Sequence, residues 1–480
     1  MAKPRARWLS GAMLALLGGC SMAPAYRPPV MAAPAAYKEM PAAGDGLWKP
    51  VDAIAPAPAA AWWTGFGDPL LDELEARIER DNPTLAGALA RYDLARATLA
   101  GARSGLFPHV ELTPGLLRNR QSDERPLRGG SQPDFYTAAT LGGDLSYEAD
   151  LWGRVRNSVA SGRALAEASR DDLAAVKLAL QGQLATDFVQ LRGQDQQLAL
   201  LAKTIDAFAR ADALTRNRFH GGIATGMDVG RAGALLGEAR AQYAALEAAR
   251  AITEHAIASL VGQPASTFAI PRRDAPLAQP AIPVGLPSTL LANRPDVAAA
   301  ERRMAAANAR IGVARAAFFP RITLGGTGGF QSTALAGLVA APNLFWAIGP
   351  GAILNIFDGG QRRADLAAAR ANWKAAMADY RSHALGAFQD VEDALATLRH
   401  LDDAQTAQAQ AVAAAASTEQ IALDRYIKGA ATYLDVATAQ ESLLRDQQSA
   451  LSLQTQRLAA SVALARALGG GITPASVRPG

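Results

Sequence analysis

The fold of this chain is decided by a stretch that occurs twice. Residues 82–108 read NPTLAGALARYDLARATLAGARSGLFP, and residues 294–320, which lie 212 positions later, read RPDVAAAERRMAAANARIGVARAAFFP. Further matches follow in the same order: 151–153 with 357–359, 218–222 with 425–429, and 260–262 with 467–469. Because the order is kept and the offset drifts by only a few residues, the pattern indicates a tandem duplication of one structural unit, with a period too long for a solenoid repeat.

The N-terminus has the pattern of a secretory signal. Three basic residues within the first seven precede an apolar stretch at 8–17, which is too short to span a membrane stably. We predict a signal peptide at 1–19. Leu17-Gly18-Gly19-Cys20 resembles a bacterial lipobox, so Cys20 is predicted to be the lipidated first residue of the mature chain; the alternative is an ordinary signal with an incidental cysteine.

Composition excludes several classes of protein. The net charge is only +4, and the 19% of charged residues have both signs interspersed, so we expect no nucleic-acid partner. Cys20 is the only cysteine of the 480 residues, which rules out an intrachain disulfide. No later segment has 18 consecutive apolar residues, so we expect no spanning helix in the mature chain.

Proline-rich segments separate the expected parts of the chain. A Pro/Ala-rich extended segment follows the signal, and a second Pro-rich segment lies between the repeats. The predicted boundaries are a signal peptide at 1–19, a lipid-anchored N-terminal segment at 20–68, a first repeat at 69–262, a linker at 263–287, a second repeat at 288–469 and a tail at 470–480.

Long helices are predicted in both repeats. From Leu173 to Phe208 the large apolar residues recur mostly in steps of three and four, which is typical of a helix that packs through a narrow seam. An unbroken helix from about 155 to 219 would be on the order of 100 Å long. Such a helix with so few large apolar residues must lie in a bundle or a tube.

Each repeat also has a pair of Gly-rich strands, predicted within about 107–150 and 319–357. Between 140 and 151 apolar and polar residues alternate, as in a transmembrane strand, and 321–330 alternates likewise. We expect 344–357 to be a weaker strand because Pro350 cannot donate to a ladder. A soluble hairpin packed on helices is the alternative. Four strands cannot close a barrel, so membrane-spanning strands would require a homo-oligomer.

Two segments, 218–228 and 425–435, are predicted to reverse the chain between long antiparallel helices. Gly222 and Gly429 lie where a helix C-cap needs a left-handed residue, and Arg218 and Arg425 lie in the last helical turn. Thr225 with Asp228, and Thr432 with Asp435, fit capping boxes that open the next helix. We call these two reversals the hairpin tips.

Taken together, these motifs resemble the outer membrane factor family, the TolC-like exit ducts of tripartite pumps, in its lipoprotein branch. The resemblance covers nearly the whole mature chain. It is carried by the two tips and by the motifs Trp62-Trp63, Phe66-Gly67-Asp68-Pro69-Leu70, Asn82-Pro83, Asp150-Leu151-Trp152-Gly153-Arg154, Arg294-Pro295-Asp296-Val297, Glu301, Ala309-Arg310-Ile311-Gly312, Phe319-Pro320 and Phe357-Asp358-Gly359-Gly360.

The resemblance implies a mainly α-helical chain with membrane β-strands, assembled as a homotrimer in the cell outer membrane. Each chain would give four strands to a shared twelve-stranded barrel, and its helices would form an α-helical tunnel through the periplasm. Implied partners are outer-membrane lipids, a periplasmic adaptor and an inner-membrane pump of the RND type. The implied function is passive conduction of small molecules.

The resemblance also assigns roles at the tips. Asp435 and Tyr426 match the periplasmic gate, where three Asp435 carboxylates would repel one another or recruit a cation. Thr438 stands where relatives often have a second acid. Arg218, Gly222, Arg425 and Gly429 match tip positions implicated in adaptor docking. The plain alternative for Asp435 is helix capping alone.

No constellation of residues predicts an enzyme, a cofactor or a bound metal. The five histidines are scattered, and no paired carboxylates or His-x-x-x-His spacing occur. Two other functions stay open from the residues: an exit duct of a type I protein secretion system and, from a different class, a periplasmic coiled-coil adaptor or scaffold lipoprotein.

Overall fold

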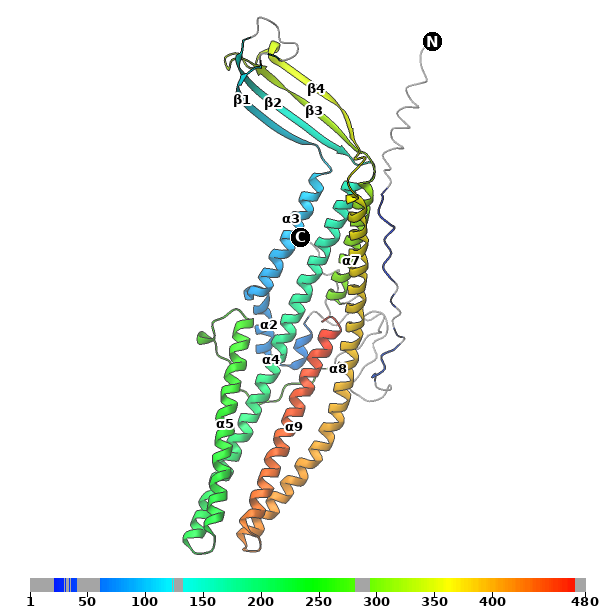
Figure 1. Ribbon diagram of the computed structural model, residues 1–480. Coiled ribbons are helices and arrows are strands. Elements are labelled where there is room, and N and C mark those ends of the chain that lie inside the picture. The colour runs from blue at the N-terminus through cyan, green and yellow to red at the C-terminus, as the bar shows by residue number, and fades with distance from the viewer. Residues whose placement is uncertain are drawn as a thin grey trace. The chain divides into compact units, whose positions relative to one another are not determined.

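The computed structural model describes residues 21–29, 31, 34, 36–40, 61–122, 124, 133–280 and 294–470. The predicted signal peptide, Cys20, residues 281–287 of the linker and residues 471–480 of the tail lie outside these ranges. The longer elements, drawn in Figure 1, are α2 (Pro69–Asp81), α3 (Pro83–Ser104), β1 (His109–Arg120), β2 (Phe135–Ala149), α4 (Arg154–His220), α5 (Gly226–Leu260), α7 (Pro295–Ala316), β3 (Arg321–Ser332), β4 (Leu344–Ile353), α8 (Gln361–Ile427) and α9 (Tyr433–Ala467). Short 3-10 helices lie at Trp62–Phe66, Ala265–Thr267 and Ala341–Asn343.

The two repeats have elements of matching length. Helices α3 and α7 each have 22 residues, α4 and α8 each have 67, and α5 and α9 each have 35. The long helix expected from about 155 to 219 is α4. Among the described residues, no helix combines the length and the hydropathy that a membrane span needs.

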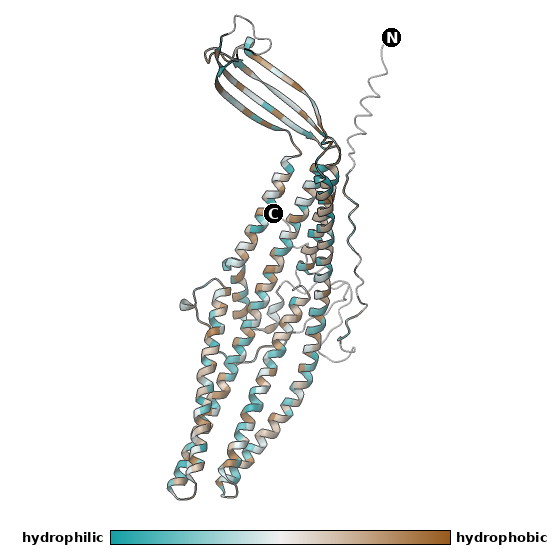
Figure 2. Cartoon of the chain, viewed as in Figure 1, coloured by the Kyte–Doolittle hydropathy of each residue, from teal (hydrophilic) through white to brown (hydrophobic). Residues whose placement is uncertain are grey.

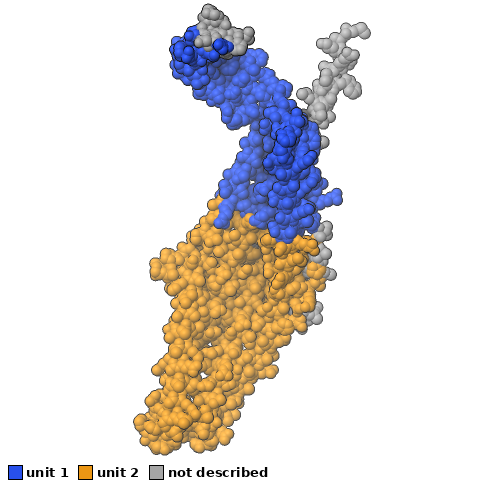
Figure 3. Space-filling model, in the orientation of Figure 1, with its two compact units in different colours: residues 1–30, 91–169, 299–380 blue, residues 31–90, 170–298, 381–480 orange. Residues whose placement is uncertain are grey.

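The chain divides into two compact units, and each unit takes segments from both repeats (Figure 3). The first unit contains the sheet and comprises 91–169 and 299–380 with the described residues of 1–30. The second unit contains the hairpin tips and comprises 170–298 and 381–480 with 31–90, in their described parts. A sequence repeat is therefore not a compact unit by itself.

The four strands form one antiparallel sheet in the order β1-β2-β3-β4, so β1 and β4 are its edges. The strand expected to be weak does form: β4 contains Pro350, which pairs in register with Leu324 of β3. An edge strand tolerates proline, since one side of its backbone has no partner among the described strands.

One face of this sheet is apolar over most of the length of all four strands, with Arg118 and Arg120 at the end of β1 as exceptions. The strand register brings onto it Val110, Leu112 and Leu116 of β1, Leu141, Leu145 and Tyr147 of β2, Ile322, Leu324 and Phe330 of β3, and Leu344, Trp346 and Ile348 of β4. The opposite face carries Glu111, Thr113, Asp144, Glu148, Thr323 and Thr327. The predicted alternation is confirmed, and it is visible as bands along the strands in Figure 2.

The N-terminal segment is bound along part of its length rather than free. In the first unit, residues 21–26 contact α7, where the Asn308 side-chain amide donates to the Pro24 carbonyl at 2.8 Å. A Cβ atom at Gly312 would lie 2.7 Å from the Ala23 Cβ atom, so only glycine admits the segment there. We call residues 21–26 the strap.

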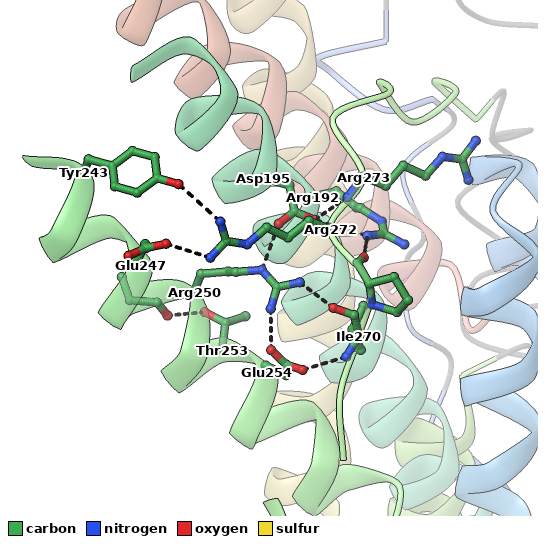
Figure 4. A network of polar contacts seen from close by, with 12 residues as sticks. Arg192, Asp195, Tyr243, Glu247, Arg250, Thr253, Glu254, Ile270, Arg272 and Arg273 are labelled. Carbon is green, nitrogen blue, oxygen red and sulfur yellow. Dashed lines mark hydrogen bonds and ion pairs between the residues drawn. The ribbon is translucent and has the colours of Figure 1, made fainter. Parts of the chain in front are cut away.

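In the second unit, a buried ionic network fixes the start of the inter-repeat connection (Figure 4). Asp195 of α4 accepts from Arg192 at 3.1 Å and from Arg250 of α5 at 2.8 Å, and all three side chains are buried. The same guanidinium groups donate to the carbonyls of Pro271 and Ile270, at 2.9 and 2.7 Å. The buried charges of Asp195, Arg192 and Arg250 are thus paired. The segment at 270–271, which follows the first repeat, is hydrogen-bonded to both α4 and α5.

An apolar core in the same unit joins the helices. It includes Leu71, Leu74 and Ile78 of α2, Leu184, Phe188 and Leu191 of α4, Ile257 of α5 and Val462 of α9. Glu75 lies on the buried side of α2 and is 1% exposed, and neither carboxyl oxygen has a hydrogen-bond partner among the described residues. Burial raises the pKa of Glu75 to about 9, with smaller contributions from Asp72 and Glu79.

Candidate functional site at the hairpin tips

Glycine ends the first helix of each hairpin. Gly222 follows α4 with φ 72° and Gly429 follows α8 with φ 78°, in the left-handed region that favours glycine. In the first tip the Ile223 amide donates to the Arg218 carbonyl at 2.8 Å, which satisfies one of the last carbonyls of α4. Both reversals therefore occur at the residues that the sequence pattern indicates.

A threonine and an aspartate open the second helix of each hairpin in the same way. The Asp228 carboxylate accepts from the Thr225 amide at 2.9 Å and from its hydroxyl at 2.8 Å. The Asp435 carboxylate accepts from the Thr432 amide and hydroxyl at the same two distances. The two aspartates are thus matched in local geometry.

The hydrogen bonds from Thr432 hold the pKa of Asp435 below its usual range, and the charge of Arg425 acts in the same direction. The repulsion expected among three Asp435 carboxylates around an axis would instead raise the pKa of Asp435. Within one chain the direction is the opposite one, and Asp435 is exposed.

Tyr426 joins the two tips of one chain. Its ring lies 4.5 Å from the guanidinium carbon of Arg218, and the Arg218 Nη1 atom donates to the Tyr426 carbonyl at 2.7 Å. The Tyr433 ring packs against it at 5.6 Å in an edge-to-face contact. Tyr426 is 6% exposed, so in this chain it lies in the contact between the hairpins and not on an open surface.

The two arginines assigned to docking differ in their surroundings. Arg218 is half-buried on Tyr426. Arg425 is exposed and has a 3.4 Å hydrogen bond to the Ala430 carbonyl of its own tip. Phe219, the counterpart of Tyr426 in the first repeat, is 46% exposed. The divergence between the repeats therefore places one aromatic residue in the contact and leaves the other outside it.

Sequence reasoning missed a group of exposed apolar residues at the tips. Ile223 and Met227 of the first tip and Ile427 and Leu434 of the second are exposed. Single-chain patterns cannot separate such residues from core positions, because they occur at helix ends where the periodicity stops. What marks these residues as a surface group is their exposure in a capped, ordered turn, and only the structure shows that exposure.

Within the described residues, no group of three or more His, Cys, Asp or Glu side chains is placed to hold a metal ion.

Comparisons with known proteins agree with this geometry. The family profile for "Outer membrane efflux protein" matches residues 76–263 and 286–470. The pyoverdine export outer membrane protein OpmQ of Pseudomonas putida is 33% identical over 422 residues, which cover 86% of this chain and 88% of OpmQ. The toluene efflux pump outer membrane protein TtgI, also of Pseudomonas putida, is 32% identical over 464 residues, which cover 95% of this chain and 97% of TtgI.

Among solved structures, the outer-membrane channel OprN superposes with a TM-score of 0.86 at 30% identity, covering 94% of this chain and 99% of OprN. The TolC-like channel architecture is thus confirmed. Since the family profile matches most of the chain, in two segments, this protein belongs to the outer membrane efflux protein family.

Proposed function

We propose that this chain is the outer-membrane exit duct of a tripartite efflux pump, and that it conducts small molecules passively. The four-stranded sheet is the observation that carries the proposal. Its apolar face runs over every strand, and both of its edges lack a partner among the described strands. Lipid accepts an apolar strand face but not an open strand edge, so each chain needs a neighbour on both sides.

Three chains of four strands supply a barrel of twelve, which is our proposal for the assembly. Each chain has two similar repeats, at 69–262 and 288–469, so three chains then place six similar segments around one axis. Export and efflux in the names of the relatives favour a pump over a protein secretion system.

We assign the tips to the periplasmic end of the duct, where a periplasmic adaptor and an RND-type inner-membrane pump engage it. Exposed apolar side chains at Ile223, Met227 and Leu434 support docking of a partner there. We place Arg425 and Gly429 in the same docking surface, together with Arg218 and Gly222.

We propose that Asp435 lines the closed entrance and that Tyr426 holds the two tips of a chain together. The exposed Asp435 carboxylate is fixed by its cap, so three copies around an axis would present a ring of charge. Opening would separate these carboxylates and release the contact between Tyr426 and Arg218.

Two matched variants test the gate. Asp435→Ala and Asp228→Ala each remove the same cap, with the same hydrogen-bond distances, so they cost the tips about the same stability. We expect Asp435→Ala alone to change single-channel conductance and cation block in planar bilayers. Equal conductance of both variants and the wild type, with intact oligomers, would leave Asp435 with a capping role only.

The duct itself is tested in a deletion strain and by purification. The deletion should raise drug susceptibility, and the cognate adaptor and pump should be recovered with the tagged protein. A protein that leaves the membrane without detergent and forms no channel would refute the proposal. Lipidation of Cys20 stays a separate prediction, which fails if fatty-acid labelling survives Cys20→Ala.

A further inference from the structure

An aromatic contact closes one end of the β2–β3 pair in the first unit. Trp152, three residues after β2, stacks on Phe319, which lies just before β3; the ring centroids are 4.7 Å apart and the planes meet at 23°. The indole Nε1 atom donates to the Pro320 carbonyl at 2.8 Å. The segment that follows β2 therefore packs against the segment that precedes β3.

The duplication supplies the same two positions a second time, at the two edges of the sheet. Phe107 and Pro108 precede β1 as Phe319 and Pro320 precede β3, and Ile356 and Phe357 follow β4 at the positions that Asp150 and Leu151 occupy after β2. These edge positions are uncovered: Phe107 is 68% exposed, Ile356 92% and Phe357 90%.

We infer that Ile356 and Phe357 of one copy pack on Phe107 and Pro108 of a second copy. This inference rests on the proposed closed assembly, in which β4 of one chain lies beside β1 of the next. The two strands would be antiparallel, because β1 is antiparallel to β2 and the alternation continues to β4. The end of β4 then meets the start of β1, as the end of β2 meets the start of β3.

The occupant is a second copy, because Phe107 repeats the Phe319 half of a contact that is complete inside the chain, and the alternation of the strands brings the end of β4 to it. We call the proposed contact of Ile356 and Phe357 with Phe107 and Pro108 of the next copy the seam. It differs from the internal contact in one respect. The counterpart of Trp152 is Asp358, whose carboxylate accepts from the Gly360 amide at 3.0 Å and pairs with Arg362. Because an aspartate replaces the indole donor at that position, the seam relies on burial of Ile356 and Phe357.

Cysteine pairs and a short bismaleimide test the seam in the full-length protein in detergent. Cys20 is the only native cysteine, so the single variants measure any reaction that goes through it. We expect Phe107→Cys combined with Ile356→Cys to give covalent dimers and trimers on denaturing gels. Each single variant should give neither. The matched internal pair, Trp152→Cys with Phe319→Cys, should react within one chain and stay monomeric on the gel.

The oligomeric state of the wild type shows whether a negative result contradicts the seam alone or the whole proposed assembly. If light scattering shows a trimer but the Phe107/Ile356 pair gives no covalent species between chains, the seam is wrong and the duct stands. If the wild type is monomeric in several detergents, the proposed assembly fails, and the seam fails with it. A second variant, Ile356→Ser with Phe357→Ser, should lower the temperature at which the trimer dissociates, whereas Leu335→Ser, at an exposed loop residue, should not.

Discussion

Glu75 lies on the buried side of α2, and its carboxyl oxygens have no hydrogen-bond partner among the described residues. The carboxyl group of Glu75 is therefore protonated in the folded state. Its folded pKa of about 9 is above the ordinary 4.5. The stabilising contribution is therefore fully present below pH 4.5 and is lost as pH rises towards 9, by about 1.4 kcal/mol per pH unit. We expect Glu75→Gln to flatten this dependence, measured as denaturation midpoints across that pH window. Parallel profiles for variant and wild type would contradict a neutral Glu75.

The charge of Asp195 compensates two buried arginines, and its loss should be costly. Asp195→Ala leaves Arg192 and Arg250 without this carboxylate in the interior, at an expected cost of about 3–5 kcal/mol. Arg272→Ala is the control, since Arg272 pairs with Glu247 at the surface and its loss should cost less than about 1 kcal/mol. Denaturation of both variants by urea, followed by circular dichroism, makes the comparison.

Local residue chemistry explains which of these features could be predicted. The glycines at 222 and 429 and the Thr–Asp caps depend on residues within one turn, so the sequence indicates them directly. The burial of Glu75 and the meeting of Asp195 with Arg250 depend on residues 55 or more positions apart or on packing against other helices. No local pattern contains that information.

At the scale of elements, the strap lies so close to α7 that only a glycine at position 312 leaves room for it. A Cβ atom at 312 would lie 2.8 Å from the Ala23 amide nitrogen, closer than packing allows. We therefore expect Gly312→Ala to displace residues 21–26 while α7 stays helical, and hydrogen exchange of the Ala23 amide should rise. Gly101→Ala in α3 is the control, because a Cβ atom there meets nothing within 4 Å. Unchanged exchange in Gly312→Ala would contradict a bound strap.

The existence of the elements followed from periodicity, while the end of β4 did not. The alternation in 140–151 and the steps of three and four in α4 predicted both elements, because each has one consistent apolar side. The weaker strand expected at 344–357 forms only over Leu344–Ile353, and the sheet order explains why it accepts Pro350, because β4 is an edge of the sheet. The Pro/Ala-rich segment was expected only to be extended, and its contacts with α7 depend on residues nearly 300 positions away.

At the scale of the whole molecule, one duplicated unit has to make two kinds of contact. The first repeat meets the second within the chain, through Trp152 at the sheet and through Arg218 and Tyr426 at the tips. In the proposed assembly, the second repeat meets the first repeat of the next chain. Divergence at Tyr426 and Asp358 thus distinguishes contacts inside a chain from contacts between chains, which a strictly repeated sequence could not do.

The orientation of the sheet in the assembly is tested by two adjacent leucines. Leu116 and Leu117 of β1 are 59% and 64% exposed and, being neighbours in a strand, lie on opposite faces. Leu116 shares the apolar face with Val110 and Leu112, so Leu116→Arg should place a charge in lipid at a cost of ~2–4 kcal/mol near the midplane. Leu117→Arg would place the same charge on the polar, water-facing side. We expect Leu116→Arg to reduce the amount of trimer recovered from outer membranes and Leu117→Arg to leave it near the wild-type amount while altering conductance. Equal losses for the two variants would mean that the apolar face does not contact lipid.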